Sequence, residues 1–324
     1  MADLEADLVI ALRRAMHYLT RDDLARICNA DPVQICEAVS SLLERGYRIE
    51  EIPGEGYRLI DLPEIIDDVS IKTLLRAEFI GREILTFRSV TSTNDVAFAL
   101  GRSGAINGTV VVADEQKRGR GRLGRSWHSP AGCGLWFSIL LRPDLSLPDS
   151  STISLASALA VAETLVEEFG IRAEIKWPND VVVNGRKICG ILTEAECVGE
   201  RVEFVVVGIG INVLNTKDDF PPEITSATSV MIESGVRASR GRLLSRVLEK
   251  FEREYMRLCN DGFSSIRPRL IGITTVLGKM VRIRSGSKEI EGMALDIDHS
   301  GSLLVRTENG VTLRITVGEV VRVE

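Results

Sequence analysis

KRGRGRLGRSW, at residues 117–127, is the stretch around which the rest of this chain is organised. Its first nine residues hold five cations and no acid, and three glycines are interleaved with them. Basic runs often mark no more than a solvated surface or a nucleic-acid contact. Glycine, however, lets the backbone approach a ligand closely, and a guanidinium group presents a planar fork of donors that suits phosphate and carboxylate oxygens. The stretch therefore predicts a loop that binds anions.

The runs on either side of this loop are typical of buried strands. VVVA at residues 110–113 precedes it, and GLWFSILL at residues 134–141 follows it. Loops that connect core strands often carry ligand-binding groups, because the strands hold the loop in place while it stays accessible. The flanking sequence favours a binding site over a simple basic surface.

The composition is that of a globular protein with two or three domains. The chain has 324 residues and a formal net charge of −6. No apolar run approaches the ~18 residues of a membrane span, and the first residues are acidic, so we predict a cytoplasmic protein without a membrane partner. Six cysteines form no C-x-x-C pair and three histidines lie far apart, which predicts no structural metal bound by the protein.

Residues 1–65 have the outline of a winged helix-turn-helix domain. Thr20 and Asp31 are each followed, three residues on, by a residue that can complete a capping box, which predicts two short helices. A hairpin around a PGEG turn is expected at residues 47–60.

The charge of this segment leaves DNA binding open. The segment holds seven arginines, no lysine and thirteen acids, so its formal charge is −6 and the rest of the chain is neutral overall. The predicted recognition helix, residues 32–44, contains Glu37 and Glu44 but no cation. DNA affinity depends largely on cations that meet phosphates, whereas base readout needs only a few side chains. The two readings are operator binding and a module kept for packing or protein contact.

Alternating helical and strand patterns at residues 66–275 predict a mixed α/β domain with one sheet and covering helices. Apolar residues recur at helical spacing in residues 151–169 and 244–258. Strands are expected at residues 174–177, 187–194 and 202–213. Residues 276–324 contain short alternating runs separated by Ser-Gly and Asn-Gly turns, which predicts a small β-barrel or sandwich.

Four polar segments of the central domain accompany the arginine loop. They are TSTN at residues 91–94, KWPND at 176–180, RKICGIL at 186–192 and GIGIN at 208–212. Each segment alone is weak evidence of a site. The hydroxyls of TSTN, for example, precede a predicted helix, and such hydroxyls usually only cap it. GIGIN does not complete a G-x-G-x-x-G fingerprint, and the chain has no G-x-x-x-x-G-K-[ST] loop, which excludes that class of nucleotide site. The order and spacing of the set are more specific than any one segment.

Together these segments resemble the biotin protein ligases. The resemblance spans the central domain and the C-terminal β cap, and the first domain resembles that of members that also act as biotin operon repressors. It implies a multidomain α+β protein with a class II synthetase-like central domain and an SH3-like C-terminal barrel. Two features depart from the family pattern. The segment at residues 220–229 is short. In the C-terminal motif, Arg322 lies one residue closer to Gly318 than the family pattern leads us to expect.

The resemblance implies a two-step reaction. Biotin carboxylate attacks the α-phosphate of MgATP to give biotinoyl-5'-AMP and pyrophosphate, and a lysine of a biotin carboxyl carrier protein then receives biotin as an amide. Cations that neutralise the two anionic reactants and hold them in line should supply much of the rate. A homodimer and operator DNA are further partners that the resemblance raises.

The resemblance also implies roles for individual residues. The expected catalytic residues are Lys187, Arg122 and Lys176. The expected biotin-binding residues are Ser92, Thr93, Asn94, Gln116, Arg120, Arg122 and Lys187. The expected nucleotide-binding residues are Gly119, Gly121, Arg122, Gly124, Arg125, Trp127, Asn179 and Asn212. Asp180 is the expected Mg²⁺ ligand, because Mg²⁺ that arrives with a nucleotide needs only a carboxylate or two.

Two alternatives to this ligase stay open. A lipoate ligase shares the fold family and related adenylation chemistry, although the KWPND run and the glycine-arginine loop favour biotin. A biotin-sensing transcription regulator would use the same site as a sensor rather than as a full ligase.

Overall fold

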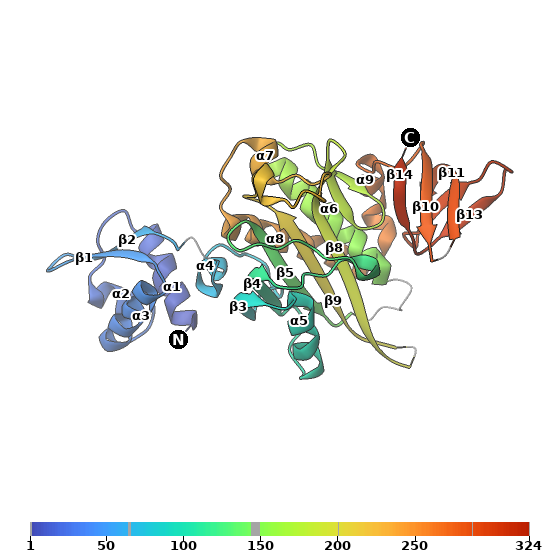
Figure 1. Cartoon of the computed structure of the whole chain (residues 1–324). Helices are drawn as coiled ribbons and strands as arrows, with labels where there is room; N and C mark the ends of the chain where they lie inside the picture. The colour runs from blue at the N-terminus through green and yellow to red at the C-terminus, as the bar shows by residue number, and fades with distance from the viewer. Residues whose placement is uncertain (1, 64–65, 144–149, 200, 287, 324) are drawn as a thin grey trace. The chain divides into compact units, whose positions relative to one another are not determined.

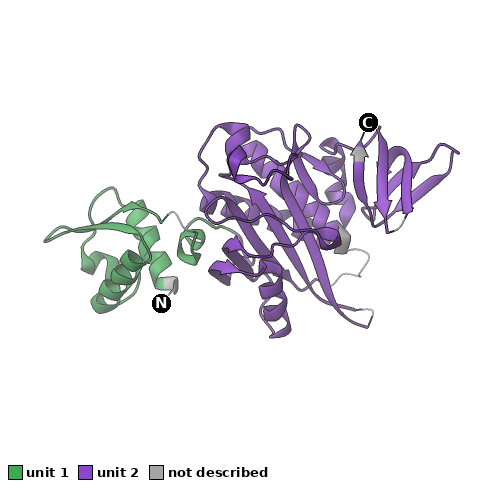
Figure 2. Ribbon diagram, viewed as in Figure 1, with its two compact units in different colours: residues 1–76 green, residues 77–324 purple. Residues whose placement is uncertain are grey.

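The computed structural model describes residues 2–63, 66–143, 150–199, 201–286 and 288–323. The chain forms two compact units, Met1–Arg76 and Ala77–Glu324 (Figure 2). None of the helices in these described ranges combines the length and the apolar character that a membrane crossing requires.

The first unit contains helices followed by an antiparallel hairpin (Figure 1). Its elements are α1 Ala2–Arg14, α2 Arg21–Ile27, α3 Pro32–Glu44, β1 Arg48–Ile52, β2 Gly56–Asp61 and α4 Asp68–Lys72. Both predicted capping boxes are confirmed, with Thr20 at the start of α2 and Asp31 at the start of α3. These caps satisfy backbone N–H groups that a helix start leaves free.

The first unit extends past residue 65, where we predicted its boundary. Val69 of α4 is fully buried in the hydrophobic core of this unit. Arg45, at the end of α3, forms ion pairs with Asp67 (2.8 Å) and with Asp68. Because these contacts hold α4 to the helices before it, the compact unit ends at Arg76.

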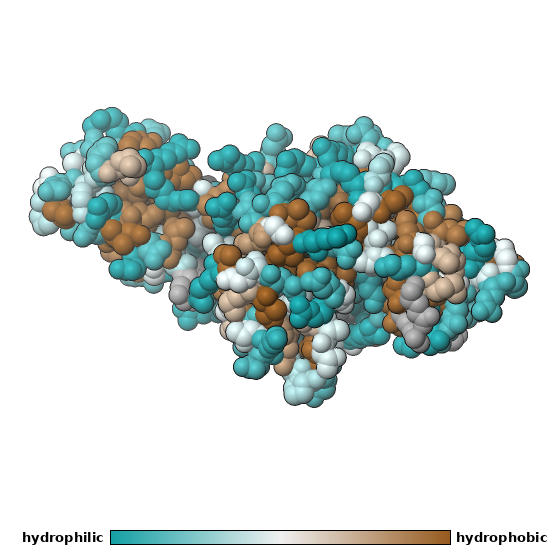
Figure 3. All heavy atoms as spheres, turned by 90° about the horizontal axis from the view of Figure 1, so that it is seen from above, coloured by the Kyte–Doolittle hydropathy of each residue, from teal (hydrophilic) through white to brown (hydrophobic). Residues whose placement is uncertain are grey.

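The surface of the first unit is mixed in polarity. Figure 3 shows hydrophobic areas between hydrophilic ones, and Met16, Ile27 and Val33 are exposed apolar side chains. Glu37 and Glu44 lie on the exposed face of α3. The acidic character that the sequence predicted for this helix is therefore a property of its accessible surface.

The second unit is built on a mixed sheet with the strand order β3-β4-β5-β9-β8-β7-β6. Its strands are β3 Ile84–Val90, β4 Val110–Gln116, β5 Gly134–Leu141, β6 Glu174–Lys176, β7 Asp180–Val183, β8 Arg186–Val198 and β9 Arg201–Asn212. β3 and β4 are parallel, and the other neighbours are antiparallel. All residues of β5 are buried, as its apolar sequence predicted.

Helices cover both faces of this sheet. They are α5 Thr93–Arg102, α6 Ser150–Phe169, α7 Val230–Ser234, α8 Arg240–Asp261 and α9 Arg267–Gly272. Successive side chains of a strand point to opposite faces. On β8, Thr193 lies 2.6 Å from Ser154 of α6, whereas Glu194 accepts a hydrogen bond from Asn94 of α5. α5 and α6 therefore lie on opposite faces, and α8 packs against α6.

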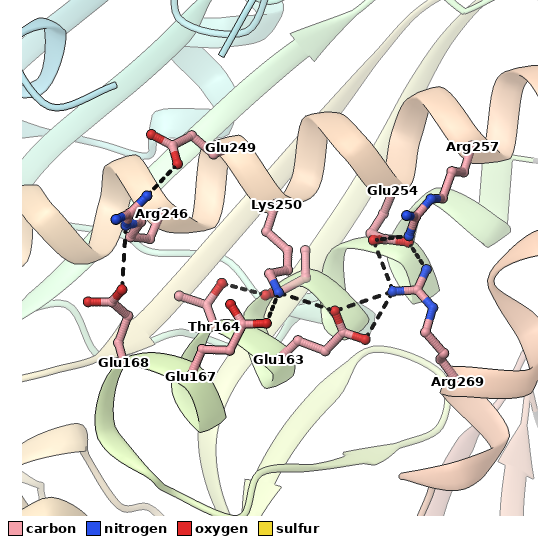
Figure 4. A network of polar contacts seen from close by, with 11 residues as sticks. Glu163, Thr164, Glu167, Glu168, Arg246, Glu249, Lys250, Glu254, Arg257 and Arg269 are labelled. Carbon is pink, nitrogen blue, oxygen red and sulfur yellow. Dashed lines mark hydrogen bonds and ion pairs between the residues drawn. The ribbon is translucent and has the colours of Figure 1, made fainter. Parts of the chain in front are cut away.

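Ion pairs join the helices behind the sheet (Figure 4). Lys250 of α8 lies 3.4 Å from Glu163 of α6, and it also pairs with Glu167. Arg269 of α9 lies 3.0 Å from Glu163 and pairs with Glu254 of α8. Lys250 and Glu254 are buried, and each has a partner of opposite charge, as a buried charge requires.

A second sheet follows α9, with the order β13-β12-β11-β10-β14. Its strands are β10 Met280–Ser285, β11 Lys288–Ile297, β12 Leu303–Arg306, β13 Thr312–Ile315 and β14 Glu319–Val323. β14 is an addition to the predicted strands, and the side chain of Arg322 lies outside the described part of the structure. Trp177 Nε1 donates to the Gly301 carbonyl (3.0 Å) and so ties this sheet to the larger one.

Candidate functional site

The arginine stretch forms a narrow hairpin between β4 and β5. Trp127 N donates to the Gly119 carbonyl (2.8 Å), and Gly121 N donates to the Arg125 carbonyl (2.7 Å). Leu123 turns the chain at the tip with a φ of 56°, in the left-handed region. Because backbone groups bond across the hairpin, its arginine side chains can reach neighbouring elements.

Glycines on β8 and β9 make a floor beneath this hairpin. A Cβ atom on Gly208 would lie 2.1 Å from Asn94 Oδ1, and one on Gly210 would lie 2.3 Å from Trp127 Nε1. Gly190 pairs with Gly210 across the strands, and a Cβ atom there would lie 2.9 Å from Trp127 Cζ3. These glycines of the GIGIN and RKICGIL segments are therefore required by close approach of side chains, not by a nucleotide fingerprint.

A pocket opens between the hairpin, the start of α5 and this glycine floor. Twelve of the predicted site residues line it: Ser92, Thr93, Asn94, Gln116, Arg120, Gly121, Arg122, Arg125, Trp127, Asn179, Asp180 and Lys187. The structure thus brings together residues that are up to about a hundred positions apart in the chain.

Four predicted site residues are not in the lining of the pocket. Asn212 is buried, and its amide donates to the Thr228 carbonyl (2.9 Å), so it holds residues 227–229 in place. Gly119 and Gly124 shape the hairpin. Lys176 lies on β6, at the far edge of the sheet. The ligand-binding and catalytic roles expected for these four residues stay predictions, since the structure places them outside the pocket lining.

The polar wall of the pocket is a connected hydrogen-bond network. Gln116 Oε1 accepts from Thr93 N (2.9 Å), and Gln116 Nε2 donates to Ser129 (2.9 Å). Ser138 Oγ lies 2.7 Å from Thr93 Oγ1 and 2.6 Å from Asn94 Oδ1. An amide oxygen cannot donate, so the single hydrogen of the Ser138 hydroxyl goes to Asn94 Oδ1, and Thr93 Oγ1 keeps an unused acceptor site.

Ser92 shows that the hydroxyls before α5 are more than caps. It occupies the N-cap position of α5, yet its side chain makes no capping hydrogen bond. Instead Ser92 is buried and lines the pocket beside Thr93. The usual reading of such a segment as a helix cap is therefore wrong for Ser92.

Cations occupy the opposite side of the pocket. Lys187 Nζ lies 2.6 Å from Asp180 Oδ1 and 5.2 Å from the centre of the Trp127 ring. Arg122 donates to Asn179 (3.1 Å) and forms no ion pair with any described residue. Burial lowers the pKa of Arg122, while Asp180 and Glu319 raise it. Arg122 remains charged, since an arginine pKa lies far above neutral pH.

Two further hairpin arginines, Arg120 and Arg125, are paired with acids. Arg125 makes a two-point contact with Glu319 of β14. Arg120 makes a two-point contact with Glu194 of β8, at 2.9 and 2.8 Å. Arg120 also lies 2.9 Å from Asp95. The hairpin is therefore tied to both sheets of the second unit.

Sequence reasoning missed several of these residues. Ser138 is a polar residue inside the apolar run of β5, and such an interruption is a signal of an internal hydrogen bond. Glu194 is likewise an acid that closely follows the Gly-Ile-Leu segment of β8. Glu319 belongs to the terminal motif that begins at Gly318, but its place beside the pocket depends on the packing of the two sheets.

The arrangement can bind a ligand with two different ends. Lys187 and Arg122 suit an anionic group, and the Thr93–Asn94–Gln116 wall suits a group that donates hydrogen bonds. Within the described residues, Trp127 Nε1 is a buried donor without a partner. The pocket therefore fits an elongated ligand that carries N–H groups at one end and negative charge at the other.

Two family models match the chain. The biotin/lipoate A/B protein ligase family matches residues 86–212, and the biotin protein ligase C-terminal domain matches residues 276–323. The first match contains the whole hairpin and the pocket floor, and the second contains β10 to β14.

Individual relatives agree with these matches. The bifunctional ligase/repressor BirA of Bacillus subtilis is 34% identical over 310 residues, which cover 95% of each chain. The biotin--[acetyl-CoA-carboxylase] ligase of Paracoccus denitrificans is 36% identical over 68% of this chain and 92% of its own. The Aquifex aeolicus biotin protein ligase, solved in complex with biotin and ATP, superposes with a TM-score of 0.65. It is 32% identical over 74% of this chain and 97% of its own. This chain belongs to the biotin protein ligase family.

Proposed function

We propose that this protein is an ATP-dependent biotin protein ligase. It forms biotinoyl-5'-AMP from biotin and ATP, and it then transfers biotin to a lysine of a biotin carboxyl carrier protein. The observation that carries the proposal is the two-sided pocket, in which an acceptor-rich wall faces Arg122 and Lys187.

The acceptor-rich wall receives the ureido ring of biotin. A cyclic urea has two N–H donors and one carbonyl acceptor, and burial makes an unpaired group costly. The unused acceptor site at Thr93 can accept a ureido N–H, and the hydroxyl of Ser92 lies beside it. Gln116 holds Thr93 in place by accepting from its backbone and its hydroxyl.

The cations serve the adenylation step. Lys187 stabilises the biotin carboxylate and the charge that develops at the bridging oxygen, while Arg122 and Arg125 hold the phosphates. The Trp127 ring, which lies on the glycine floor beside Lys187, offers a flat surface to adenine. The hydrogen bond from Arg122 to Asn179 holds the hairpin tip over the biotin carboxylate and the α-phosphate of ATP.

Asp180 would hold the Mg²⁺ that arrives with ATP. Its carboxylate lies in the pocket and its partner is a single lysine, which fits an ion whose other ligands are phosphate and water oxygens. Mg²⁺ supplies charge neutralisation on the phosphates. This chain contributes the carboxylate that positions the ion and the lysine beside it.

Pyrophosphate release tests this proposal. We expect release with ATP, Mg²⁺ and biotin, and little release when lipoate replaces biotin. Transfer to a carrier protein should then appear as a biotin-dependent mass increase on the carrier. Release with lipoate but not with biotin would identify a lipoate ligase, and release with neither acid would leave the pocket as a sensor.

A second function is favoured because the similarity to repressor relatives extends over the first unit. The identity to BirA of Bacillus subtilis extends over 95% of this chain and so includes the first unit. We infer that this unit is a winged helix-turn-helix that binds operator DNA as part of a biotin-responsive homodimer. A twofold dimer matches a palindromic site. We also infer an SH3-like barrel for β10 to β14 and a cytoplasmic location.

The acidic surface of the first unit makes the DNA proposal specific. With Glu37 and Glu44 exposed on α3, few cations meet phosphates, so binding should depend only weakly on salt. A gel-shift titration at several salt concentrations, with biotin and ATP present, measures that dependence. No binding to the protein's own upstream DNA at micromolar protein would remove this second function.

A further inference from the structure

We propose that Glu194 is a positioning residue of the ligand pocket, with two tasks. Its carboxylate sets the orientation of the Asn94 amide, and it anchors Arg120 at the base of the hairpin. Naming biotin as the ligand rests on the proposed function. The two contacts of Glu194 are independent of the identity of the ligand.

The first task follows from the donors and acceptors around Asn94. Asn94 is 3% exposed, and its Nδ2 donates to Glu194 Oε2 (2.7 Å) and to the Leu192 carbonyl (3.3 Å). A carboxylate and a carbonyl can only accept, so the amide oxygen must face the other way. Asn94 Oδ1 therefore accepts the Ser138 hydroxyl hydrogen (2.6 Å), which leaves the Thr93 hydroxyl oxygen with an unused acceptor site.

The second task concerns the base of the hairpin. Both terminal nitrogens of Arg120 contact Glu194, and one of them also lies 2.9 Å from Asp95. A guanidinium group that is paired with two acids has few N–H donors left for a ligand anion. We therefore replace the expected role of Arg120 in biotin binding with that of an anchor, and leave the biotin carboxylate to Arg122 and Lys187.

One carboxylate thus links the ureido wall to the hairpin. Asn94 is on α5, Glu194 is on β8, and Arg120 is on the hairpin that carries Trp127. The two acids around Arg120 would repel an anionic ligand if the arginine were absent, so the anchor also neutralises its surroundings. Glu194 acts on the ligand through these neighbours and does not itself line the pocket.

The test compares Glu194→Gln with Glu196→Gln. Glu196 lies two residues further along the same face of β8, where it makes its own two-point contact with Arg102 at 2.9 and 3.1 Å. It is a matched control because it has the same chemistry and no pocket partner. We expect Glu194→Gln to raise the KM for biotin roughly 10- to 100-fold, since a charge-assisted hydrogen bond to Asn94 is lost. The KM for ATP and kcat should stay within about threefold, and Glu196→Gln should match the wild type.

Direct biotin binding by calorimetry, without ATP, separates this proposal from the proposed function. Weaker binding to Glu194→Gln alone supports the positioning role even if the wild type releases no pyrophosphate. Equal biotin affinity in the two variants overturns it, and so does an equal rise in the KM values for biotin and ATP. If Glu194→Gln does not unfold cooperatively, Glu194→Asp keeps the charge but withdraws it from Asn94. It should then show a smaller loss of affinity, and unchanged binding would again overturn the role.

Discussion

Two of the cation–carboxylate pairs beside the pocket, Lys187–Asp180 and Arg120–Glu194, differ in how firmly the cation is held. Among the described residues, Lys187 has one acidic contact, to Asp180 at 2.6 Å. Arg120 has a two-point contact with Glu194 and a further contact with Asp95. A lysine is a point charge on a flexible stem, whereas an arginine fork bound at two points has a defined geometry. Lys187 can therefore exchange its partner for a ligand anion, while Arg120 stays bound to protein.

The lesson is that a count of cations in a sequence does not give the number available to a ligand. The hairpin arginines look equivalent in the sequence, yet Arg120 and Arg125 are paired with acids and Arg122 is not paired with any described acid. A salt bridge on a surface contributes little stability, but it still decides where a side chain points. Substitutions at the two ends of the pocket should therefore give different kinetic signatures.

The largest effect is expected from Lys187→Ala. Loss of a cation aimed at developing charge should lower kcat for pyrophosphate release roughly 100- to 1,000-fold. Lys176→Ala is the comparison. The sequence predicts that this substitution also lowers kcat, whereas the structure puts Lys176 outside the pocket lining. A loss of similar size in both variants would contradict the distinction between pocket cations and the other lysines.

Alanine substitutions in the floor should separate the two ends of the pocket. Gly210→Ala pushes Trp127 beside Lys187 and should raise the KM for ATP, whereas Gly208→Ala pushes Asn94 and should raise the KM for biotin, each roughly tenfold. Overpacking costs about 1–3 kcal/mol, so thermal unfolding must be recorded as well. Gly272→Ala, where no atom lies within 4 Å of the added Cβ, is the control. The same kinetic change in both floor variants would mean that the ends are not independent.

Asp180→Asn should change the need for metal while leaving Lys187 in place. We expect the Mg²⁺ concentration for half-maximal pyrophosphate release to rise roughly tenfold, because a carboxylate beside the ion is lost. Lys187 would no longer be paired with a carboxylate, so its charge should partly offset the loss of activity at saturating Mg²⁺. A Mg²⁺ titration of the variant with fixed ATP measures the shift, and an unchanged midpoint would exclude Asp180 from the metal site.

The smallest effect is expected from Glu319→Gln, which loosens Arg125 from β14. The Arg125 side chain is 57% exposed in this pair, so the change in unfolding free energy should stay below about 1 kcal/mol. The KM for ATP should change by about threefold or less, since Arg125 remains near the phosphates. A stability loss well above that size in a urea titration would show that the two sheets depend on this contact.

Local features of the fold were predictable from the sequence. The caps at Thr20 and Asp31 are confirmed because a capping box closes within four residues. The boundary after the first unit was misplaced because α4 is held by Val69 and by Arg45, contacts that no local pattern reveals. β14 was missed as a strand because its residues were read as a motif, and its partner β10 lies far back in the chain.

The sequence by itself determined the family, the loop with its arginines, the two glycine-containing segments and twelve of the residues that line the pocket. Only the tertiary structure decided which of those cations are engaged by acids. Glu194 lies 74 positions from Arg120, and Glu319 lies 194 positions from Arg125. Caps, turns and periodicity arise from neighbours in the chain, so a sequence displays them. The electrostatic surroundings of a side chain depend on the register of strands that meet over long separations, and folding alone brings those groups together.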